Sequence, residues 1–239
     1  GYVMVKYNGT NEKVKLQITC PDQSCYTYLI SDRGAYDTFP LTAGNGSYAL
    51  QVLENVAGDT YTVSLAQSIN VNIEDEFLPF LYPNQYVNFH TDSKAVSKGS
   101  DLAKDTYSDL DVVQNIYNYV IKNISYDTEK AQNVSYGYVP DIDDTLSSKK
   151  GICFDYAALM ASMLRSQNIP TKLEVGYSGD AYHAWISTYI DDKGWVDDII
   201  QFNGDTWQIM DPTLAATNDS DAVKKYIGDG SHYVVKYTY

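Results

Sequence analysis

The sequence predicts an α+β protein in which a small all-β sandwich, residues 1–80, precedes a domain of helices and antiparallel strands, residues 81–239. Two observations support this division. The first part carries short runs of β-branched and aromatic residues between turn residues, a pattern typical of a sandwich. Past residue 100, apolar residues recur at a spacing of four, the period of an amphipathic helix, before strand patterns return.

Length and charge restrict the classes of function. The chain has 239 residues, of which 44% are hydrophobic and 20% charged, so it can bury a core and is not disordered as a whole. Its 31 acidic side chains outnumber 17 basic ones, which gives a net charge of -14. Because this charge repels phosphates and anionic lipids, we expect no nucleic-acid partner. No apolar run reaches the roughly 18 residues of a membrane-spanning helix, so we expect no membrane-spanning segment.

Residues 1–80 contain six segments that alternate apolar and polar residues and end at turn residues. They are residues 3–7, 14–18, 26–30, 47–53, 60–66 and 69–73. The pair Asn45-Gly46, which favours tight turns, directly precedes the fourth segment. Six short strands at this spacing predict a sandwich that is immunoglobulin-like in outline, without a cluster of reactive side chains.

Two of the three cysteines, Cys20 and Cys25, lie on either side of the turn-forming segment Pro-Asp-Gln-Ser. In an oxidising compartment they can form a disulfide, and in a reducing one they are two partly buried thiols. We expect no zinc site there, because no further Cys or His lies at the usual spacing for a ligand. The third cysteine, Cys153, is left unpaired.

Two helices are expected in residues 81–239. The first covers residues 109–124, where Ser108 and Asp111 have the spacing of a capping box. The apolar positions of this helix are Val112, Ile116, Val120 and Ile124. The second covers residues 152–167 and ends before Pro170. Residues 126–150 between them form a long polar connection rich in Tyr and Asp, and connections of this length are often functional.

Four strands are expected to follow the second helix. They are residues 171–177, 182–190, 195–202 and 206–210. The pair Asn203-Gly204 predicts a hairpin between the last two. The second domain is therefore expected to place its helices before an antiparallel sheet.

Cys153 is the candidate nucleophile, since it lies in the first turn of the second predicted helix, directly after Gly151 and Ile152. The free N–H groups and partial positive charge of a helix N-terminus stabilise a thiolate. Gly151 leaves space for a substrate carbonyl, and the backbone N–H of Cys153 can donate to an oxyanion.

A nucleophilic thiol needs a base, and the base needs an orienting partner. His183 begins a predicted strand, and Asp211 ends the last hairpin strand just before Pro212. Neighbouring antiparallel strands can bring such a start and such an end to one level. We therefore predict Cys153 as nucleophile, His183 as base and acid, and Asp211 as the residue that orients the imidazole.

Four motifs in this order resemble the transglutaminase-like superfamily. They are K-G-I-C-F-D-Y-A at residues 150–157, Gly176-Tyr177, His183-Ala184-Trp185 and Asp211-Pro212-Thr213. The resemblance spans residues 105–215 and includes all three triad residue types. It implies a papain-related α+β core with the cysteine on a helix and the His and Asp on adjacent antiparallel strands.

The same resemblance limits what can be expected of function. Members of this superfamily include cross-linking enzymes, peptidases, other amide hydrolases and proteins that have lost activity. They often use a further oxyanion donor upstream of the cysteine, for which Tyr117 and Tyr126 are the candidates here. Asp155 is expected to favour the helix dipole or an internal hydrogen bond.

Each of the three candidate catalytic residues also has a purely structural interpretation. Taken alone, Cys153 fits a buried core thiol, His183 a packed strand histidine and Asp211 a turn cap. The acidic groups at residues 141–144 and 197–198 invite a calcium site, but neither has the glycine of a calcium loop, so solvated acidic loops are expected. His90 and His232 have no partner in the sequence pattern.

We therefore expect cysteine-dependent acyl transfer at amide bonds through a thioester, by a peptidase, an amide hydrolase or a cross-linking enzyme, with no cofactor and no metal. The substrate is expected to be a protein or peptide, including cell-wall or surface polymer. The high Tyr content is typical of secreted surface proteins, and with the resemblance it leads us to expect a bacterial secreted or cell-surface protein. Because the sequence begins at Gly1 and not at Met, a signal peptide or lipid anchor could have stood upstream. The alternative is a non-catalytic surface protein that keeps the fold and binds through its Tyr-rich residues 126–138.

Overall fold

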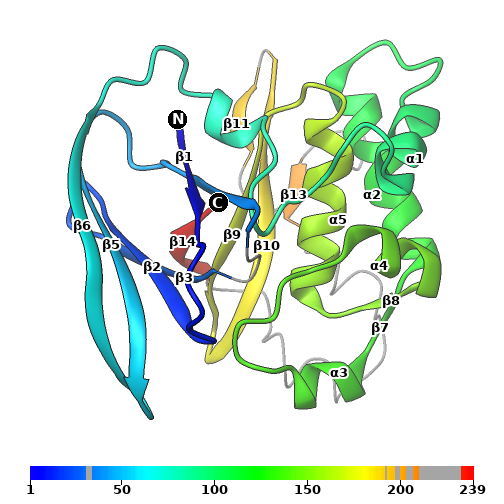
Figure 1. The fold of residues 1–239 in the computed structure, drawn as a ribbon. Helices are drawn as coiled ribbons and strands as arrows, with labels where there is room; N and C mark the ends of the chain where they lie inside the picture. Colours follow the sequence, from blue (N-terminus) through cyan, green and yellow to red (C-terminus); the bar gives the residue numbers. More distant parts are fainter. Residues whose placement is uncertain (31–33, 192, 197–199, 203–206, 210–232) are drawn as a thin grey trace. The chain divides into compact units, whose positions relative to one another are not determined.

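The structure, a computed structural model, describes residues 1–30, 34–191, 193–196, 200–202, 207–209 and 233–239. The chain forms two compact units, Gly1–Pro79 and Phe80–Tyr239. The first unit is built of strands up to the short 3-10 helix η1 (Leu78–Phe80) at its end, and the second combines helices with antiparallel strands (Figure 1). This confirms the predicted α+β class with an all-β N-terminal region. The assignment of the two units to a sandwich domain and a catalytic domain stays a prediction.

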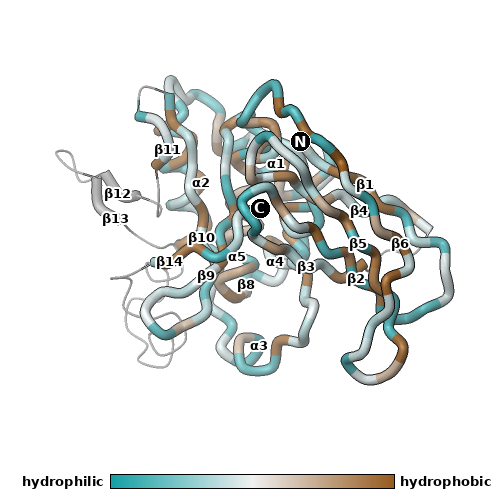
Figure 2. Tube along the Cα trace, turned by 90° about the vertical axis from the view of Figure 1, so that its left-hand side faces the viewer, coloured by the Kyte–Doolittle hydropathy of each residue, from teal (hydrophilic) through white to brown (hydrophobic). Residues whose placement is uncertain are grey.

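The unit Gly1–Pro79 contains two antiparallel sheets, one of order β1-β4 and one of order β3-β2-β5-β6. The strands are β1 (Tyr2–Lys6), β2 (Val14–Thr19), β3 (Cys25–Leu29), β4 (Tyr36–Pro40), β5 (Gly46–Ala57) and β6 (Thr60–Val71). Hydrophobic stretches mark β2 and β5 in Figure 2. The ring centroids of Tyr28 and Phe39, one from each sheet, lie 4.8 Å apart, so the sheets share one core.

Two strand predictions in this unit need correction. Residues 60–66 and 69–73, expected as two strands, lie mostly in one continuous strand, β6. Because β6 is at the edge of its sheet, Gln67 and Ser68 remain exposed and do not interrupt it. Strand β4 was not predicted. The immunoglobulin-like outline stays a prediction.

The cysteines of this unit are free thiols, with Cys20 buried and Cys25 exposed. Burial raises the pKa of Cys20, which favours its neutral form. The disulfide that the sequence allows is therefore not formed in the structure.

The unit Phe80–Tyr239 has five helices among its described residues. They are α1 (Lys94–Leu102), α2 (Asp109–Asn123), α3 (Thr128–Asn133), α4 (Ile142–Ser148) and α5 (Cys153–Arg165). Helix α5 lies between strands of a sheet on one side and α1, α2 and α4 on the other (Figure 1). It is almost wholly apolar, as its buried central position requires.

The strands of this unit are mostly antiparallel. They are β7 (Ser125–Tyr126), β8 (Lys150–Gly151), β9 (Thr171–Ser178), β10 (Ala181–Ile190), β11 (Gly194–Val196), β12 (Ile200–Phe202), β13 (Trp207–Ile209) and β14 (Tyr233–Thr238). The main sheet has the order β11-β10-β9-β14, and β7 and β8 pair in parallel. Strand β13 pairs with β12, which confirms the predicted hairpin. Among the strands that are described, β13 does not neighbour β10.

Both predicted helices are confirmed, as α2 and α5. The hydroxyl of Ser108 accepts a hydrogen bond from the Asp111 backbone N–H at 3.2 Å and so caps α2. Helices α1, α3 and α4 and strand β14 were not predicted.

The connection at residues 126–150, expected as a loop, contains α3 and α4. The side chain of Asp127 caps α3 by accepting from the Lys130 N–H at 2.9 Å. Asp141 caps α4, and the carboxylate of Asp143 accepts from the backbone N–H groups of Lys94 and Ala95 at the start of α1. Asp141 and Asp143 are therefore helix caps, and Asp144 lies exposed in the first turn of α4, so these acidic residues do not form a solvated loop. Residues 197–198 lie outside the described part of the chain.

Arg165 is the last residue of α5 and is buried in the core. Its guanidinium is buried and donates three hydrogen bonds of 2.8 Å, to the backbone carbonyls of Thr171, Tyr82 and Tyr239. These bonds fix the start of β9 and two distant segments to the helix that begins with Cys153. Of the described helices, none combines the length and the apolar character that crossing a membrane requires.

Candidate active site

Cys153 is the first residue of α5, and Ile152 is its N-cap in an extended conformation. The side chain of Cys153 is half-buried, so its sulfur is neither enclosed in the core nor fully in solvent. The sequence predicted this position at the N-terminus of a helix, where free backbone N–H groups favour negative charge.

A buried network of polar side chains supports this helix start. Asp155 is fully buried, and its carboxylate accepts a hydrogen bond from the Ile152 backbone N–H at 2.8 Å. The ammonium of Lys130 lies 2.7 Å from the same carboxylate and 2.6 Å from the Tyr138 hydroxyl. Tyr138 in turn donates to Asp155. The network thus ties α3 and the segment after it to the turn that presents Cys153, and it confirms the expected internal hydrogen bond of Asp155.

Gly151 is needed because Asp155 folds back over it. A Cβ atom at Gly151 would lie 2.7 Å from the Asp155 Cβ and 3.2 Å from its Oδ2, closer than side chains tolerate. The position of the Asp155 carboxylate therefore requires a glycine two residues before the candidate nucleophile. The sequence indicates a second role for Gly151, access of a substrate carbonyl to the sulfur.

His183 lies on β10 and is paired with Gly176 on β9. Its side chain is 1% exposed, and its ring lies 6.1 Å from Trp185 and 6.3 Å from Tyr233, centroid to centroid. Strand β14 packs on the other side of β9, where a Cβ at Gly176 would lie 2.0 Å from the Val234 carbonyl oxygen. The Gly176 position therefore lets three strands meet closely beside the histidine.

Cys153 and His183 line the same cavity, which has a volume of about 300 Å³. Tyr126, one of the two candidate oxyanion donors, also lines it. The other, Tyr117, is buried on α2 and is absent from the described lining. Asp211 lies outside the described residues, as does His232, and His90 is exposed away from the lining.

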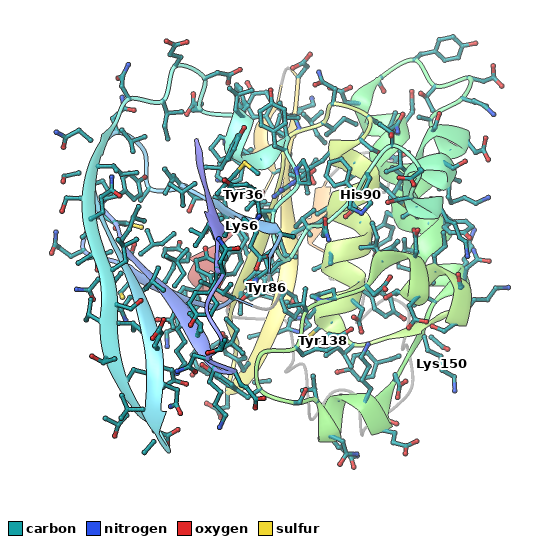
Figure 3. All side chains as sticks on the ribbon, viewed as in Figure 1. Lys6, Tyr36, Tyr86, His90, Tyr138 and Lys150 are labelled. Carbon is teal, nitrogen blue, oxygen red and sulfur yellow. The ribbon has the colours of Figure 1, made fainter. Side chains whose placement is uncertain are left out.

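The remaining part of the described lining has eleven residues, of which five are aromatic, and the sequence reasoning assigned none of these five to the catalytic site. It includes Tyr86, Tyr138, Phe154, Tyr182 and Tyr239. Tyr86 and Tyr138 lie beside the N-terminal end of α5 (Figure 3). Phe154 and Tyr182 directly adjoin Cys153 and His183 in the sequence, and Tyr138 ends the Tyr-rich residues 126–138. Tyr86 and Tyr239 lie in no motif, and for them the only sequence signal was the high content of Tyr, 23 residues.

Three tyrosines of the cavity have a raised pKa, which favours their neutral form. Burial raises the pKa of Tyr86 to about 12 and also raises the pKa of Tyr182. The pKa of Tyr138 is raised first by burial and then by its hydrogen bond to Asp155. In the described part of the chain, no group of three His, Cys, Asp or Glu side chains could hold a metal ion. The cavity therefore offers a thiol, an imidazole and neutral phenols, a set suited to nucleophilic chemistry.

Residues 97–197 match the family model described as "Transglutaminase-like superfamily". UPF0252 protein MJ1282 of Methanocaldococcus jannaschii is 30% identical over 118 residues, which are 43% of this chain and 34% of that protein. Kyphoscoliosis peptidase of Mus musculus is 30% identical over 107 residues, 39% of this chain and 16% of that protein. The matches thus span about a third and about a sixth of these relatives' own lengths.

Among solved structures, the periplasmic domain of TgpA from Pseudomonas aeruginosa is similar at a TM-score of 0.48 and 14% identity. The match covers 96% of this chain and 90% of that one. At this TM-score the likeness supports no argument about function, and the family assignment depends on residues 97–197.

Proposed function

Because this chain carries a domain of the transglutaminase-like superfamily, we propose that it is a cysteine enzyme that transfers acyl groups from amide bonds. The observation that carries the proposal is that Cys153, at the start of α5, and His183, on β10, line one cavity. Two residue types that form a nucleophile–base pair thus meet from segments 30 positions apart.

The proposed reaction begins with attack of the Cys153 thiolate on the carbonyl carbon of a peptide or carboxamide bond. The C–N bond then breaks as the His183 imidazolium gives its proton to the leaving amine, and a thioester on Cys153 remains. Water or a second amine attacks the thioester, loses a proton to His183 and restores the thiolate. In this proposal Asp211 orients the imidazole, as the sequence motif implies.

Two donors are proposed for the oxyanion that forms during attack. The first is the backbone N–H of Cys153, and the second is the hydroxyl of Tyr126, which lines the cavity. Oxyanion donors of this kind contribute about 10² to 10³ in rate, and general acid–base transfer a further 10² to 10⁴ or so.

We propose water as the more favoured acceptor, because nothing in the sequence marks a channel for a lysine side chain. The name of the mouse relative, a peptidase, supports hydrolysis. Incubation with a fluorescent amine and a glutamine-rich protein distinguishes the two acceptors, since incorporation indicates transfer and fragments without incorporation indicate proteolysis. The extracellular location and the surface-polymer substrate stay predictions.

Alkylation with iodoacetamide at pH 6 tests the proposed nucleophile against an internal control. Cys25 is an exposed free thiol in the same chain, whereas Cys153 is half-buried. If access alone decided the rate, Cys25 would react first. An activated thiolate should make Cys153 react at least about tenfold faster, measured by peptide mass spectrometry.

Equal or slower labelling of Cys153 would overturn the proposal. The alternative would then be the non-catalytic binding protein that keeps this fold. Cys153→Ala, with Cys25→Ala as its matched control, separates labelling at the two sites.

A further inference from the structure

The cavity beside Cys153 has a continuous aromatic surface. The ring of Tyr86 lies 5.3 Å from Phe154 and 4.8 Å from Tyr239, and Tyr138 lies 6.5 Å from Phe154, centroid to centroid. These four rings come from four separate segments but meet around the first turn of α5. Val134 adds an aliphatic side chain from the end of α3.

No Asp, Glu, Lys or Arg is among the residues described as lining this cavity. Four charged side chains directly adjoin lining residues in the chain: Asp127, Lys130, Asp155 and Glu174. Lys130 and Asp155 are paired with each other at 2.7 Å, and both contact the Tyr138 hydroxyl. Their charges are thus compensated behind the wall. Asp127 caps α3, and Glu174 accepts a hydrogen bond from the Ser187 hydroxyl. Burial also raises the pKa of Tyr86 and Tyr182, which keeps these two phenols of the lining neutral.

The size of the cavity limits its occupant. A volume of about 300 Å³ is at the lower end of the range for ligand sites, which is about 300–1,000 Å³. It fits one large side chain with the adjoining backbone and does not fit a long folded segment.

We propose that this cavity binds an uncharged aromatic or aliphatic side chain of the acyl-donor peptide and selects against acidic and basic side chains at that position. The proposal rests on the proposed function, since it assumes that the peptide is attacked by Cys153. An apolar side chain exchanges water for the rings of Tyr86, Phe154 and Tyr239, which is favourable. A charged side chain would lose hydration there. The only charges proposed in the described lining, those of the Cys153 thiolate and the His183 imidazolium, compensate each other.

N-acetylated dipeptidyl chloromethyl ketones test this specificity, because the Cys153 thiolate displaces their chloride and forms a stable thioether. Two series carry Phe, Leu, Asp or Lys either next to the ketone or one residue before it. The second-order rate of Cys153 modification is measured by peptide mass spectrometry, which separates Cys153 from the exposed Cys25, and is divided by the rate with iodoacetamide. In one of the two series, Phe and Leu should exceed both Asp and Lys by about tenfold or more.

The outcomes separate this inference from the proposed function. Equal normalised rates across both series, or a preference for Asp or Lys, would overturn the specificity while leaving the nucleophile intact. A Cys153 that is inert to iodoacetamide as well would overturn the proposed function itself.

A variant of the wall sharpens the test. Val134→Asp places a carboxylate at a lining position that is 42% exposed, so the fold should tolerate it. The ratio of the Lys rate to the Phe rate should rise by about threefold or more, the effect of one partly solvated charge pair. Gln132→Glu adds the same charge to an exposed site outside the lining and should leave this ratio unchanged.

If Val134→Asp is not folded by circular dichroism, Ser135→Asp, at the next lining residue, replaces it. An unchanged ratio in the folded wall variant would contradict the proposal.

Discussion

In the unit Gly1–Pro79 the buried side chains that the structure describes are apolar, aromatic or the thiol of Cys20, whereas the buried polar and charged ones lie in Phe80–Tyr239. Asp155, Arg165 and His183 are all at most 3% exposed. The two units therefore differ in the polarity of the side chains that they bury.

This difference shows in which unit buried polar and charged groups are stabilised by dedicated contacts. A buried charge is costly unless partners compensate it, so a fold keeps such a group only with dedicated contacts. Arg165 has three carbonyl acceptors, and Asp155 has an ammonium, a phenol and a backbone N–H. Both groups belong to α5, the helix that presents Cys153. The two buried charges thus fix the two ends of the helix that begins with Cys153, whereas the described buried side chains of the first unit form an apolar and aromatic core.

The largest effect expected from this comparison is the difference in lost stability when one carboxylate is removed from each unit. Asp155→Ala removes the partner of Lys130 and leaves the Ile152 N–H without an acceptor. We expect the free energy of unfolding to fall by about 3 kcal/mol. Asp22→Ala in the first unit removes a carboxylate that accepts two hydrogen bonds from Ser24 at an exposed turn, and we expect a loss of less than about 1 kcal/mol.

Urea denaturation followed by circular dichroism measures both variants. All three tryptophans, Trp185, Trp195 and Trp207, lie in the second unit, so their fluorescence reports its unfolding separately. Asp155→Asn, which keeps the shape and one acceptor, should lose less than Asp155→Ala. Equal losses from Asp155→Ala and Asp22→Ala would break the comparison between the units.

The smallest expected effect is the pH dependence of Asp22. Hydrogen bonds from the Ser24 hydroxyl and backbone N–H lower the pKa of this carboxyl in the folded chain. Its contribution is therefore present above the pKa of the unfolded chain, about 3.8, and is lost as pH falls through the lower folded value. Because the group is exposed, the free energy of unfolding of wild type should exceed that of Asp22→Asn by less than about 1 kcal/mol at pH 7. The two proteins should become equal near pH 2, and a difference that persists there would show that charge is not the cause.

The parts of the fold that were predicted are those with strong local patterns. Helices α2 and α5 have an apolar stripe and a clear start or end, and the hairpin β12-β13 has its Asn-Gly turn. Helices α3 and α4 are too short to show a helical period, and only their Asp caps mark them. Strand β14 has a strand-like sequence, but its pairing with β9, more than 50 residues away, cannot be inferred from local pattern.

The candidate site was predicted to a similar degree. Cys153 and His183 were identified because motif and local structure agree on both, and the structure places them at one cavity. The aromatic lining was not predicted as a unit, because Tyr86, Tyr138 and Tyr239 come from distant segments. Of these three, only Tyr138 lies in a segment, residues 126–138, that the sequence marked as a contact surface. Asp211 lies outside the described residues and stays a prediction.

The central claim is that one imidazole activates one sulfur. It is tested most directly by the rate of Cys153 alkylation with iodoacetamide between pH 5 and pH 9 in wild type, His183→Ala and His90→Ala. The last replaces an exposed histidine outside the cavity lining and serves as the matched control. The account predicts fast labelling that persists at pH 6 in wild type and His90→Ala, and a fall of about tenfold or more at this pH in His183→Ala. Identical pH profiles in all three folded proteins would contradict it.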